Sequence, residues 1–200
     1  MRKFLHVGCG HKTKSLTTSG FNTDDWNEIR YDIDPSVKPD YVGSMTDISS
    51  IDNDSVDAVF SSHNIEHLYA HEVPTALGEF YRVLNDLGVV VLTCPDLRSV
   101  CALIAQDNLT EPAYVSPAGP ISPIDILYGH RESMRRGNLY MAHKCGFTQK
   151  VLVSTLQSAG FKSVVSKSRG APYFDLWAIA TKTKKNEDDL RGLSKKHFPS

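Results

Sequence analysis

The stretch Gly88–Cys94, which reads Gly-Val-Val-Val-Leu-Thr-Cys, constrains the fold of this 200-residue chain more than any other. Its apolar residues run almost continuously instead of alternating, which is typical of a strand buried on both faces, as in a parallel sheet. A helix is expected just before it over Val73–Leu84, where apolar residues form one stripe. Asn85–Gly88 is expected to turn the chain from this helix into the strand. This order predicts right-handed parallel crossovers.

Other short apolar segments complete a sheet of seven strands. The remaining strands are expected over Lys3–Val7, Ile29–Ile33, Asp40–Gly43, Val56–Ser61, Val164–Lys167 and Phe174–Lys182. A short connection joins the last two, which favours an antiparallel hairpin. Two further helices are expected over Leu97–Gln106 and Gln149–Ala159, the second capped by Thr148 and followed by Gly160. We therefore expect an α/β fold with a mostly parallel seven-stranded sheet, helices on both faces and a C-terminal antiparallel hairpin.

The same pattern predicts a single domain over residues 1–182. Within it, about residues 107–147 are rich in Pro, Gly and Tyr and show little periodicity, so we interpret them as an insertion that acts as a lid or binding loop. Residues 183–200 are highly charged and lack a core pattern, which predicts a flexible tail.

Composition limits the partners of the chain. The net charge is −1, from 22 basic and 23 acidic residues, so no overall field attracts nucleic acid or an anionic membrane. The apolar stretch after Met1 is too short for a signal peptide or a membrane span, and we expect a cytoplasmic protein. The cysteines are scattered, and His143-x-Cys145 combined with Cys9 or His11 matches no structural zinc pattern; no metal site is predicted.

Gly8-Cys9-Gly10 follows the first predicted strand and is the strongest candidate binding loop. Glycines there allow a sharp turn and the close approach of a ligand, although a simple tight turn has the same pattern. Asp32 ends the second strand about 20 residues later, where an acid can accept hydrogen bonds from a ribose. Asp34 lies on the same side of the strand and is the alternative; either acid could instead stabilise a turn. Thr13 occupies the third glycine position of a dinucleotide motif, which disfavours a nicotinamide cofactor.

Taken together, several segments resemble the successive motifs of class I S-adenosylmethionine-dependent methyltransferases, and most closely the type-11 family. These segments are Val7–Gly10, Tyr31–Pro35, Gly43–Ile48, Ser55–Leu68 and Glu79–Leu84. The resemblance covers Phe4 to about Asp96 and implies a Rossmann-like fold. The chain departs from the family in two ways: no third glycine closely follows Gly10, and no helix precedes the first strand. We therefore expect the insertion to cover the cofactor.

The resemblance also implies which residues bind the cofactor S-adenosylmethionine, whose product is S-adenosylhomocysteine. They are Gly8, Gly10, Asp32, Met45, Thr46, Asp47, Ile48, Ser62 and His63. By this resemblance the glycines line the methionine part and Asp32 binds the ribose. Asp47 accepts from the adenine amino group, with its neighbours around the base, while Ser62 and His63 face the amino-acid moiety and the sulfonium. From the residues alone, a capped turn is the favoured explanation of Asp47, and only the surrounding motifs favour adenine binding.

Histidine is the side chain suited to take a proton from a methyl acceptor at neutral pH. His63 and His143 are the first candidates for a catalytic base, whereas His67 is interpreted as a packed helix residue. His130 also lies in the insertion, as do three tyrosines that are candidates for an acceptor pocket: Tyr114, Tyr128 and Tyr140.

The predicted function is methyl transfer to a small-molecule acceptor, without nucleic acid or membrane, and a homodimer is left open. The alternatives are a non-catalytic cofactor-binding protein of the same fold and, third, an NAD(P)-dependent oxidoreductase.

Overall fold

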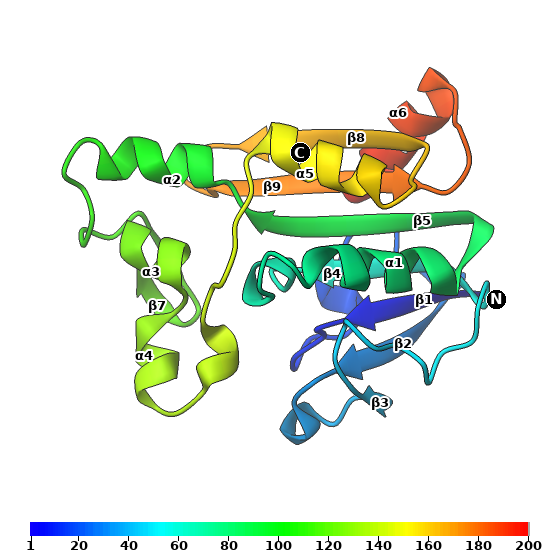
Figure 1. Ribbon diagram of the computed structural model, residues 1–200, viewed down its shortest axis with the longest axis horizontal. Coiled ribbons are helices and arrows are strands. Elements are labelled where there is room, and N and C mark those ends of the chain that lie inside the picture. Colours follow the sequence, from blue (N-terminus) through cyan, green and yellow to red (C-terminus); the bar gives the residue numbers. More distant parts are fainter. Residues whose placement is uncertain (200) are drawn as a thin grey trace.

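A seven-stranded sheet runs through the centre of the molecule (Figure 1). The computed structural model describes residues 1–199. The strands lie in the order β3-β2-β1-β4-β5-β9-β8. Their bounds are Arg2–Val7 (β1), Trp26–Asp32 (β2), Tyr41–Val42 (β3), Val56–Ser62 (β4), Leu84–Pro95 (β5), Ser163–Arg169 (β8) and Asp175–Thr181 (β9). Strands β1 to β5 pair in parallel, and β9 pairs antiparallel with both β5 and β8. The predicted mostly parallel sheet with a C-terminal antiparallel hairpin is therefore confirmed.

Strand β5 lies inside this sheet, between β4 and β9, and is buried from Gly88 to Pro95, as its sequence predicted. The turn expected over Asn85–Gly88 is not a separate connection in the structure, because these residues belong to β5. Helix α1 (Val73–Val83) ends immediately before β5, and Leu84 already pairs with Val56 of β4. The register then shifts before Val89, so the turn residues are accommodated as an irregularity within the strand.

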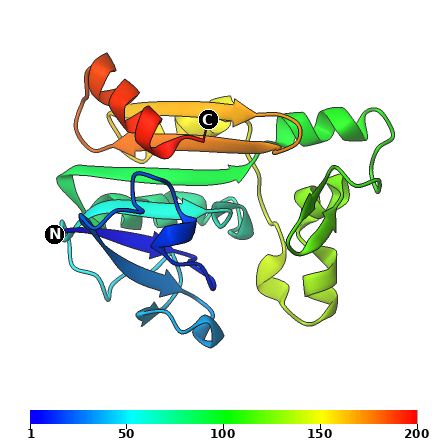
Figure 2. The same ribbon diagram turned by 180° about the vertical axis from the view of Figure 1, so that it is seen from behind.

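Helices cover both faces of the sheet (Figures 1 and 2). Helices α1 and α5 (Gln149–Ser158) pack on one face, where Leu77 and Leu152 join the main hydrophobic core and are fully buried. Thr148 stands at the N-cap position of α5, but its side chain makes no capping hydrogen bond. Gly160 has a φ of 105°, as expected of the residue that ends this helix.

The charged C-terminal segment is not an unstructured tail, since residues Glu187–His197 form helix α6 on the opposite face of the sheet (Figure 2). His197 is buried, and its Nδ1 lies 2.7 Å from the Thr18 hydroxyl. Leu193 and Phe198 pack against a core cluster that contains Phe21. Because α6 is rich in charged residues, the side chains that face the core could not be recognised from the sequence. Ser200 lies outside the described residues.

The insertion, expected to be irregular, contains short regular elements that follow helix α2 (Leu97–Ile104). They are β6 (Tyr114–Ser116), β7 (Gly119–Ile121), α3 (Pro123–Tyr128), α4 (Arg131–Arg135) and the 3-10 turn η4 (Leu139–Met141). They lie on the side to which the parallel strands point (Figure 1). Val100, Ile121, Ile126 and Phe174 form a small core that holds them against the rest of the molecule. Elements of three to six residues are too short to show a period. Among residues 1–199, no helix is long and apolar enough to span a membrane.

Candidate functional site

The bend after β1 requires glycine at two positions, for different reasons. Gly8 and Gly10 have φ values of 65° and 53°, a region that costs other residues energy. A Cβ atom on Gly8 would also collide with the side chain of Asn64. A Cβ atom on Gly10 would meet nothing within 4 Å, so this glycine borders open space. The bend thus presents bare backbone to a ligand at the carboxyl end of the sheet.

Asp32, at the end of β2, holds this bend in place. Its side chain is almost buried, and its Oδ2 accepts a hydrogen bond of 2.7 Å from the Gly10 amide. Its Oδ1 accepts from the Asp34 amide at 2.9 Å. Each carboxylate oxygen can accept a second hydrogen bond, so Asp32 can still receive ribose hydroxyls. Asp34 instead accepts from the Ser36 amide at 2.8 Å, and its hydrogen bonds to Ser36 lower the pKa of its carboxyl. Asp32 thus contacts the glycine bend, whereas Asp34 caps its own turn.

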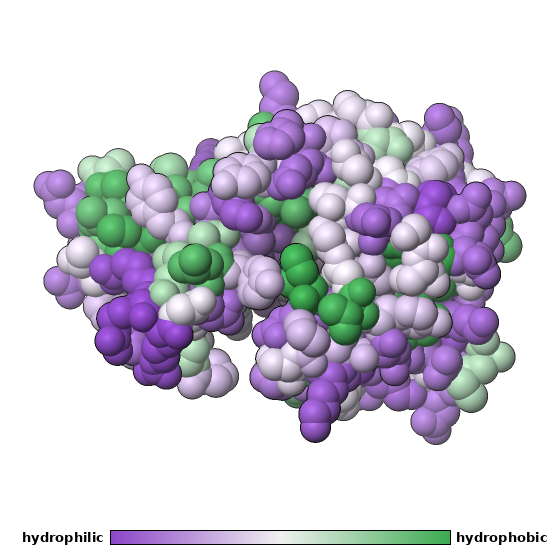
Figure 3. Space-filling model, turned by 60° about the horizontal axis from the view of Figure 1, so that its bottom comes forward, coloured by the Kyte–Doolittle hydropathy of each residue, from purple (hydrophilic) through white to green (hydrophobic). Residues whose placement is uncertain are grey.

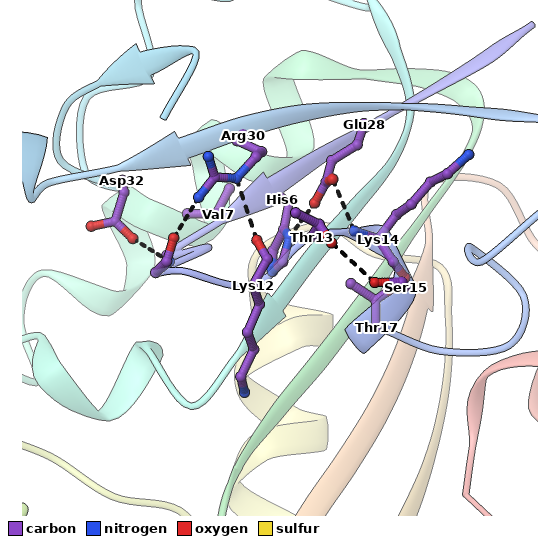
Figure 4. A network of polar contacts seen from close by, with 12 residues as sticks. His6, Val7, Lys12, Thr13, Lys14, Ser15, Thr17, Glu28, Arg30 and Asp32 are labelled. Atoms are coloured by element: carbon purple, nitrogen blue, oxygen red, sulfur yellow. Dashed lines mark hydrogen bonds and ion pairs between the residues drawn. The ribbon is translucent and has the colours of Figure 1, made fainter. Parts of the chain in front are cut away.

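A further polar network ties the segment after the bend to β2 (Figure 4). The Arg30 guanidinium donates to the carbonyl oxygens of Gly10 and Lys12. Glu28 accepts from the Lys14 amide at 2.9 Å and lies 2.6 Å from Nδ1 of the buried His6. These contacts fix the course of the loop without a third glycine, because the segment is held by side chains of the neighbouring strand.

Sequence analysis assigned no role to Asn64, which joins the carboxyl ends of β1 and β4. Its Nδ2 donates to the carbonyl oxygens of Val7 at 3.1 Å and Ser62 at 3.0 Å. Its position directly after the predicted binding residues Ser62 and His63 was the one feature of the sequence that could have indicated a role for Asn64. Asn64 thus holds the ends of β1 and β4 together beneath the glycine bend, and leaves the bend open to a ligand.

The loop predicted to surround the adenine follows β3. Asp47 is exposed and accepts from the Ser49 amide at 3.2 Å, and hydrogen bonds to Ser49 lower its pKa. This is the capped turn that its sequence also suggested, and one carboxylate oxygen stays available. The Tyr31 hydroxyl donates to the Asp47 carbonyl at 2.7 Å and fixes the loop. Ile48 is fully buried in the core, so its side chain is not presented to a ligand, while Met45 is partly buried against the same core.

At the end of β4, the Ser62 hydroxyl lies 2.9 Å from that of Thr93 on β5. His63 follows with a φ of 54°, an unusual conformation for a residue other than glycine. Its amide donates to the Thr93 carbonyl at 2.9 Å, and its side chain is 47% exposed. Strained backbone of this kind persists where surrounding contacts enforce it and is concentrated at functional sites.

A cavity of about 250 Å³ lies between this strand end and the insertion. It brings together His63, His143, His130 and Tyr114, four residues singled out in the sequence. The other lining residues are Glu66, His67, Pro95, Ala118, Ile121, Asp125, Ile126, Ser133, Met141, Tyr173 and Phe174. The space-filling view shows the molecule hollowed between the insertion and the body of the sheet (Figure 3).

Two of the tyrosines considered for this pocket do not line it. Tyr128 and Tyr140 are 60% and 56% exposed, respectively. A larger groove, of about 1120 Å³, lies at the amino ends of the strands beside Arg2, Trp26 and Asp57. Open α/β sheets bind ligands at their carboxyl ends, so we place the site in the smaller cavity and at the glycine bend beside it.

The structure also brings together three side chains that sequence spacing did not connect. Metal-ligating atoms of Glu66, His67 and His143 all lie within 4.8 Å of one another. The cysteines considered in the sequence are not part of this group. Burial raises the pKa of both the Cys9 and Cys145 thiols to about 11, so they stay protonated at neutral pH.

Comparisons with known proteins agree with this geometry. The family model Methyltransf_11, described as a methyltransferase domain, matches residues 5–92. This range includes the glycine bend, Asp32, the loop that follows β3 and the end of β4. No curated protein matches the chain at significant similarity.

Solved structures share the fold at low sequence identity. A protein from Pyrococcus horikoshii OT3 has a TM-score of 0.61 and 12% identity, covering 92% of this chain and 83% of its own. A SAM-dependent methyltransferase from Archaeoglobus fulgidus has a TM-score of 0.56 and 17% identity, covering 90% and 86%. A Thermotoga maritima protein described as a SAM-dependent methyltransferase, possible histamine N-methyltransferase, has a TM-score of 0.55 and 13% identity, covering 92% and 83%.

Proposed function

We propose that the chain, whose residues 5–92 match the Methyltransf_11 family model, transfers a methyl group from S-adenosylmethionine to a small molecule bound in the 250 Å³ cavity. One observation carries the proposal: a glycine bend that borders open space is clamped by an acid on the neighbouring strand. This arrangement stands at the carboxyl ends of β1 and β2, where such sheets bind nucleosides.

The residues around the bend fit the parts of S-adenosylmethionine. Gly8 and Gly10 offer backbone to the methionine part, and Asp32 keeps acceptor capacity for ribose hydroxyls. Asp47 has a free carboxylate oxygen for the adenine amino group, although it also caps its own turn. Ser62 and His63 stand where the amino-acid moiety is expected.

S-adenosylmethionine supplies a methyl carbon that a positively charged sulfur already activates. The work left to the protein is to align the acceptor and, where needed, to remove its proton. Transfer forms a bond from the acceptor to the methyl carbon and breaks the carbon–sulfur bond, whose electron pair stays on sulfur. His63 and His143 both line the acceptor cavity and are the residues placed to take an acceptor proton.

The size and lining of the cavity indicate the class of acceptor. A volume of 250 Å³ is near the lower end of ligand pockets, which suits a small molecule. Aromatic side chains of Tyr114, Tyr173 and Phe174 line it beside the histidines. The near-neutral chain offers no general attraction for nucleic acid.

Calorimetric titration of the full chain with S-adenosylhomocysteine, and separately with NADH, tests the proposal. We expect one molecule of S-adenosylhomocysteine per chain and no binding of NADH. Binding of NADH alone would instead support an oxidoreductase. Binding of S-adenosylhomocysteine without methyl transfer to any small hydroxyl or amine acceptor would leave a non-catalytic binding protein.

A further inference from the structure

Glu66 is the least satisfied polar side chain of the site. It lies in the 3-10 turn η3 (Ile65–His67) and is only 1% exposed. Neither carboxylate oxygen has a hydrogen-bond partner among residues 1–199. The nearest nitrogen of a titratable side chain is Nδ1 of His63, 3.4 Å from Oε1. A buried carboxylate without hydrogen bonds is costly and is normally paired with a cation or a metal.

His67 and His143 complete the surroundings of this carboxylate. Nδ1 of His67 lies 3.0 Å from the Ala142 carbonyl oxygen, and Nδ1 of His143 lies 2.8 Å from that of Ile126. A carbonyl oxygen can only accept, so each Nδ1 carries the hydrogen and each Nε2 keeps its lone pair. Carbonyl contacts of this kind orient metal-ligating histidines.

Backbone hydrogen bonds hold the segment that contains His143 beside the turn that contains Glu66 and His67. The amides of Lys144 and Cys145, in the insertion, donate to the Glu66 carbonyl at 2.8 and 3.2 Å. The rings of His67 and His143 pack edge to face, with centroids 4.9 Å apart. His143 is thereby held beside η3 although it is distant in sequence. Preorganisation of this kind is expected of a binding site.

We propose that Glu66, His67 and His143 bind one divalent transition-metal ion, and that the ion is Zn²⁺. Two imidazoles and one carboxylate are a ligand set of catalytic zinc sites, in which a fourth position stays open. Mg²⁺ and Ca²⁺ prefer sites built of oxygen ligands. Zinc bonds of about 2.0–2.1 Å place tetrahedral ligand atoms about 3.3 Å apart. The present atoms lie within 4.8 Å of one another, so binding of the ion requires the side chains to rotate towards one another.

The open position indicates the acceptor class, an inference that rests on the proposed function. All three ligand residues line the acceptor cavity, so a ligand of the ion enters from there. Zn²⁺ lowers the pKa of a bound hydroxyl, which favours an acceptor that is methylated on oxygen. Transfer then forms a carbon–oxygen bond, leaves the carbon–sulfur electron pair on sulfur, and passes the hydroxyl proton to His63. His143, as a metal ligand, is no longer available as the base.

Titration of the chelator-stripped full chain with ZnCl₂ in a calorimeter tests the site. We expect one ion per chain, and an affinity at least about 100-fold lower in Glu66→Gln, which keeps the shape of the side chain. Two variants are matched controls: His71→Asn removes an exposed histidine outside the cluster, and Cys101→Ser removes the exposed thiol. Both should bind Zn²⁺ as the wild-type chain does.

Loss of zinc binding in Cys101→Ser, with full affinity in Glu66→Gln, would overturn the proposal, as would a wild-type chain that binds no zinc. The visible spectrum of the Co²⁺-loaded wild-type chain adds a readout that does not depend on the folding of a variant. We expect the bands of a nitrogen and oxygen site, and an intense thiolate-to-cobalt band would contradict the assignment. Titration of the metal-free wild-type chain with S-adenosylhomocysteine separates the two proposals, because its failure refutes the methyl-donor site and leaves the metal site standing.

Discussion

Replacement of Asp32 by alanine removes the acceptor of two backbone amides at once. The Gly10 and Asp34 amides lose hydrogen bonds of 2.7 and 2.9 Å to a charged, almost buried group. A hydrogen bond to a charged partner contributes about 1.5–3 kcal/mol. Water can reach the Asp34 amide near the surface, so we expect the free energy of unfolding to fall by about 3 kcal/mol, the lower end of the sum.

The same substitution removes the proposed acceptor of the ribose hydroxyls. We expect the affinity for S-adenosylhomocysteine to fall by about 1–3 kcal/mol, or about 5- to 150-fold, measured by calorimetry under conditions where the variant is folded. Asp32→Asn should lie between the wild type and the alanine variant. Its amide oxygen can serve one backbone N–H, but its NH₂ group then faces the other donor.

Asp34→Ala is the matched control, because Asp34 lies on the same strand end but caps only its own turn through Ser36. We expect it to bind S-adenosylhomocysteine as the wild type does. A folded Asp32→Ala chain with wild-type affinity, or a loss of affinity confined to Asp34→Ala, would refute the reasoning that the glycine bend and Asp32 hold the nucleoside.

Two further predictions concern stability. Gly8→Ala should lower the free energy of unfolding in urea by more than about 1–2 kcal/mol, because the positive φ and the collision with Asn64 add. Asn64→Ala removes the collision together with the hydrogen bonds to Val7 and Ser62, so Gly8→Ala should cost less in the Asn64→Ala chain than in the wild type. Equal stability of Gly8→Ala and wild type would contradict both causes. Burial, followed by the charges of Lys196 and Arg2, lowers the pKa of His197 from 6.5 to about 4. The unfolded chain therefore binds the additional proton between these values, and the stabilising contribution of neutral His197 is complete above pH 6.5. It should decline by up to about 1.4 kcal/mol per pH unit towards pH 4. Urea unfolding of wild type and His197→Gln across this range should show a steeper pH dependence in the wild type; parallel curves would contradict it.

The sheet could be predicted because its signals are local. Gly88–Cys94 indicated a buried strand, and Gly8 and Gly10 marked the end of the first one. The strand order was not predicted, because it depends on β1 pairing with β4 and β5 pairing with β9, strands that are distant in sequence. The bend and Asp32 could be placed together because two strand ends adjacent in the sheet bring their next residues into contact.

Long-range packing explains what could not be predicted. Helix α6 carries charges at most positions, and its stability depends on Leu193, Phe198 and His197 meeting residues near Phe21. Nothing within residues 183–200 reveals that partner. Similarly, the irregularity after Leu84 depends on the pairing of that residue with Val56. In both cases tertiary contacts override a local pattern that favoured a tail or a turn.

The metal cluster shows the same limit at the level of the site. His63 and His143 were recognised as histidines near the reaction, but Glu66 was not, and His67 was interpreted as packing. Their common role depends on the path of the insertion, which returns to η3 so that the Lys144 and Cys145 amides meet the Glu66 carbonyl. Spacing between ligands in sequence carries no such information when the intervening chain is long and folded.

The path of the insertion indicates that it supplies part of the proposed site in addition to covering it. An insertion that only covered the site would contribute none of the residues proposed to bind the metal ion or the acceptor. In the structure, the insertion supplies His143 together with Ile126 and Ala142, the carbonyls that orient both imidazoles. The proposed methyl-donor site is built by β1, β2 and β4, whereas the proposed acceptor site needs the insertion. The proposed acceptor site is therefore complete only when the insertion is packed against the sheet, so substitutions in the insertion should alter acceptor binding without weakening binding of the donor.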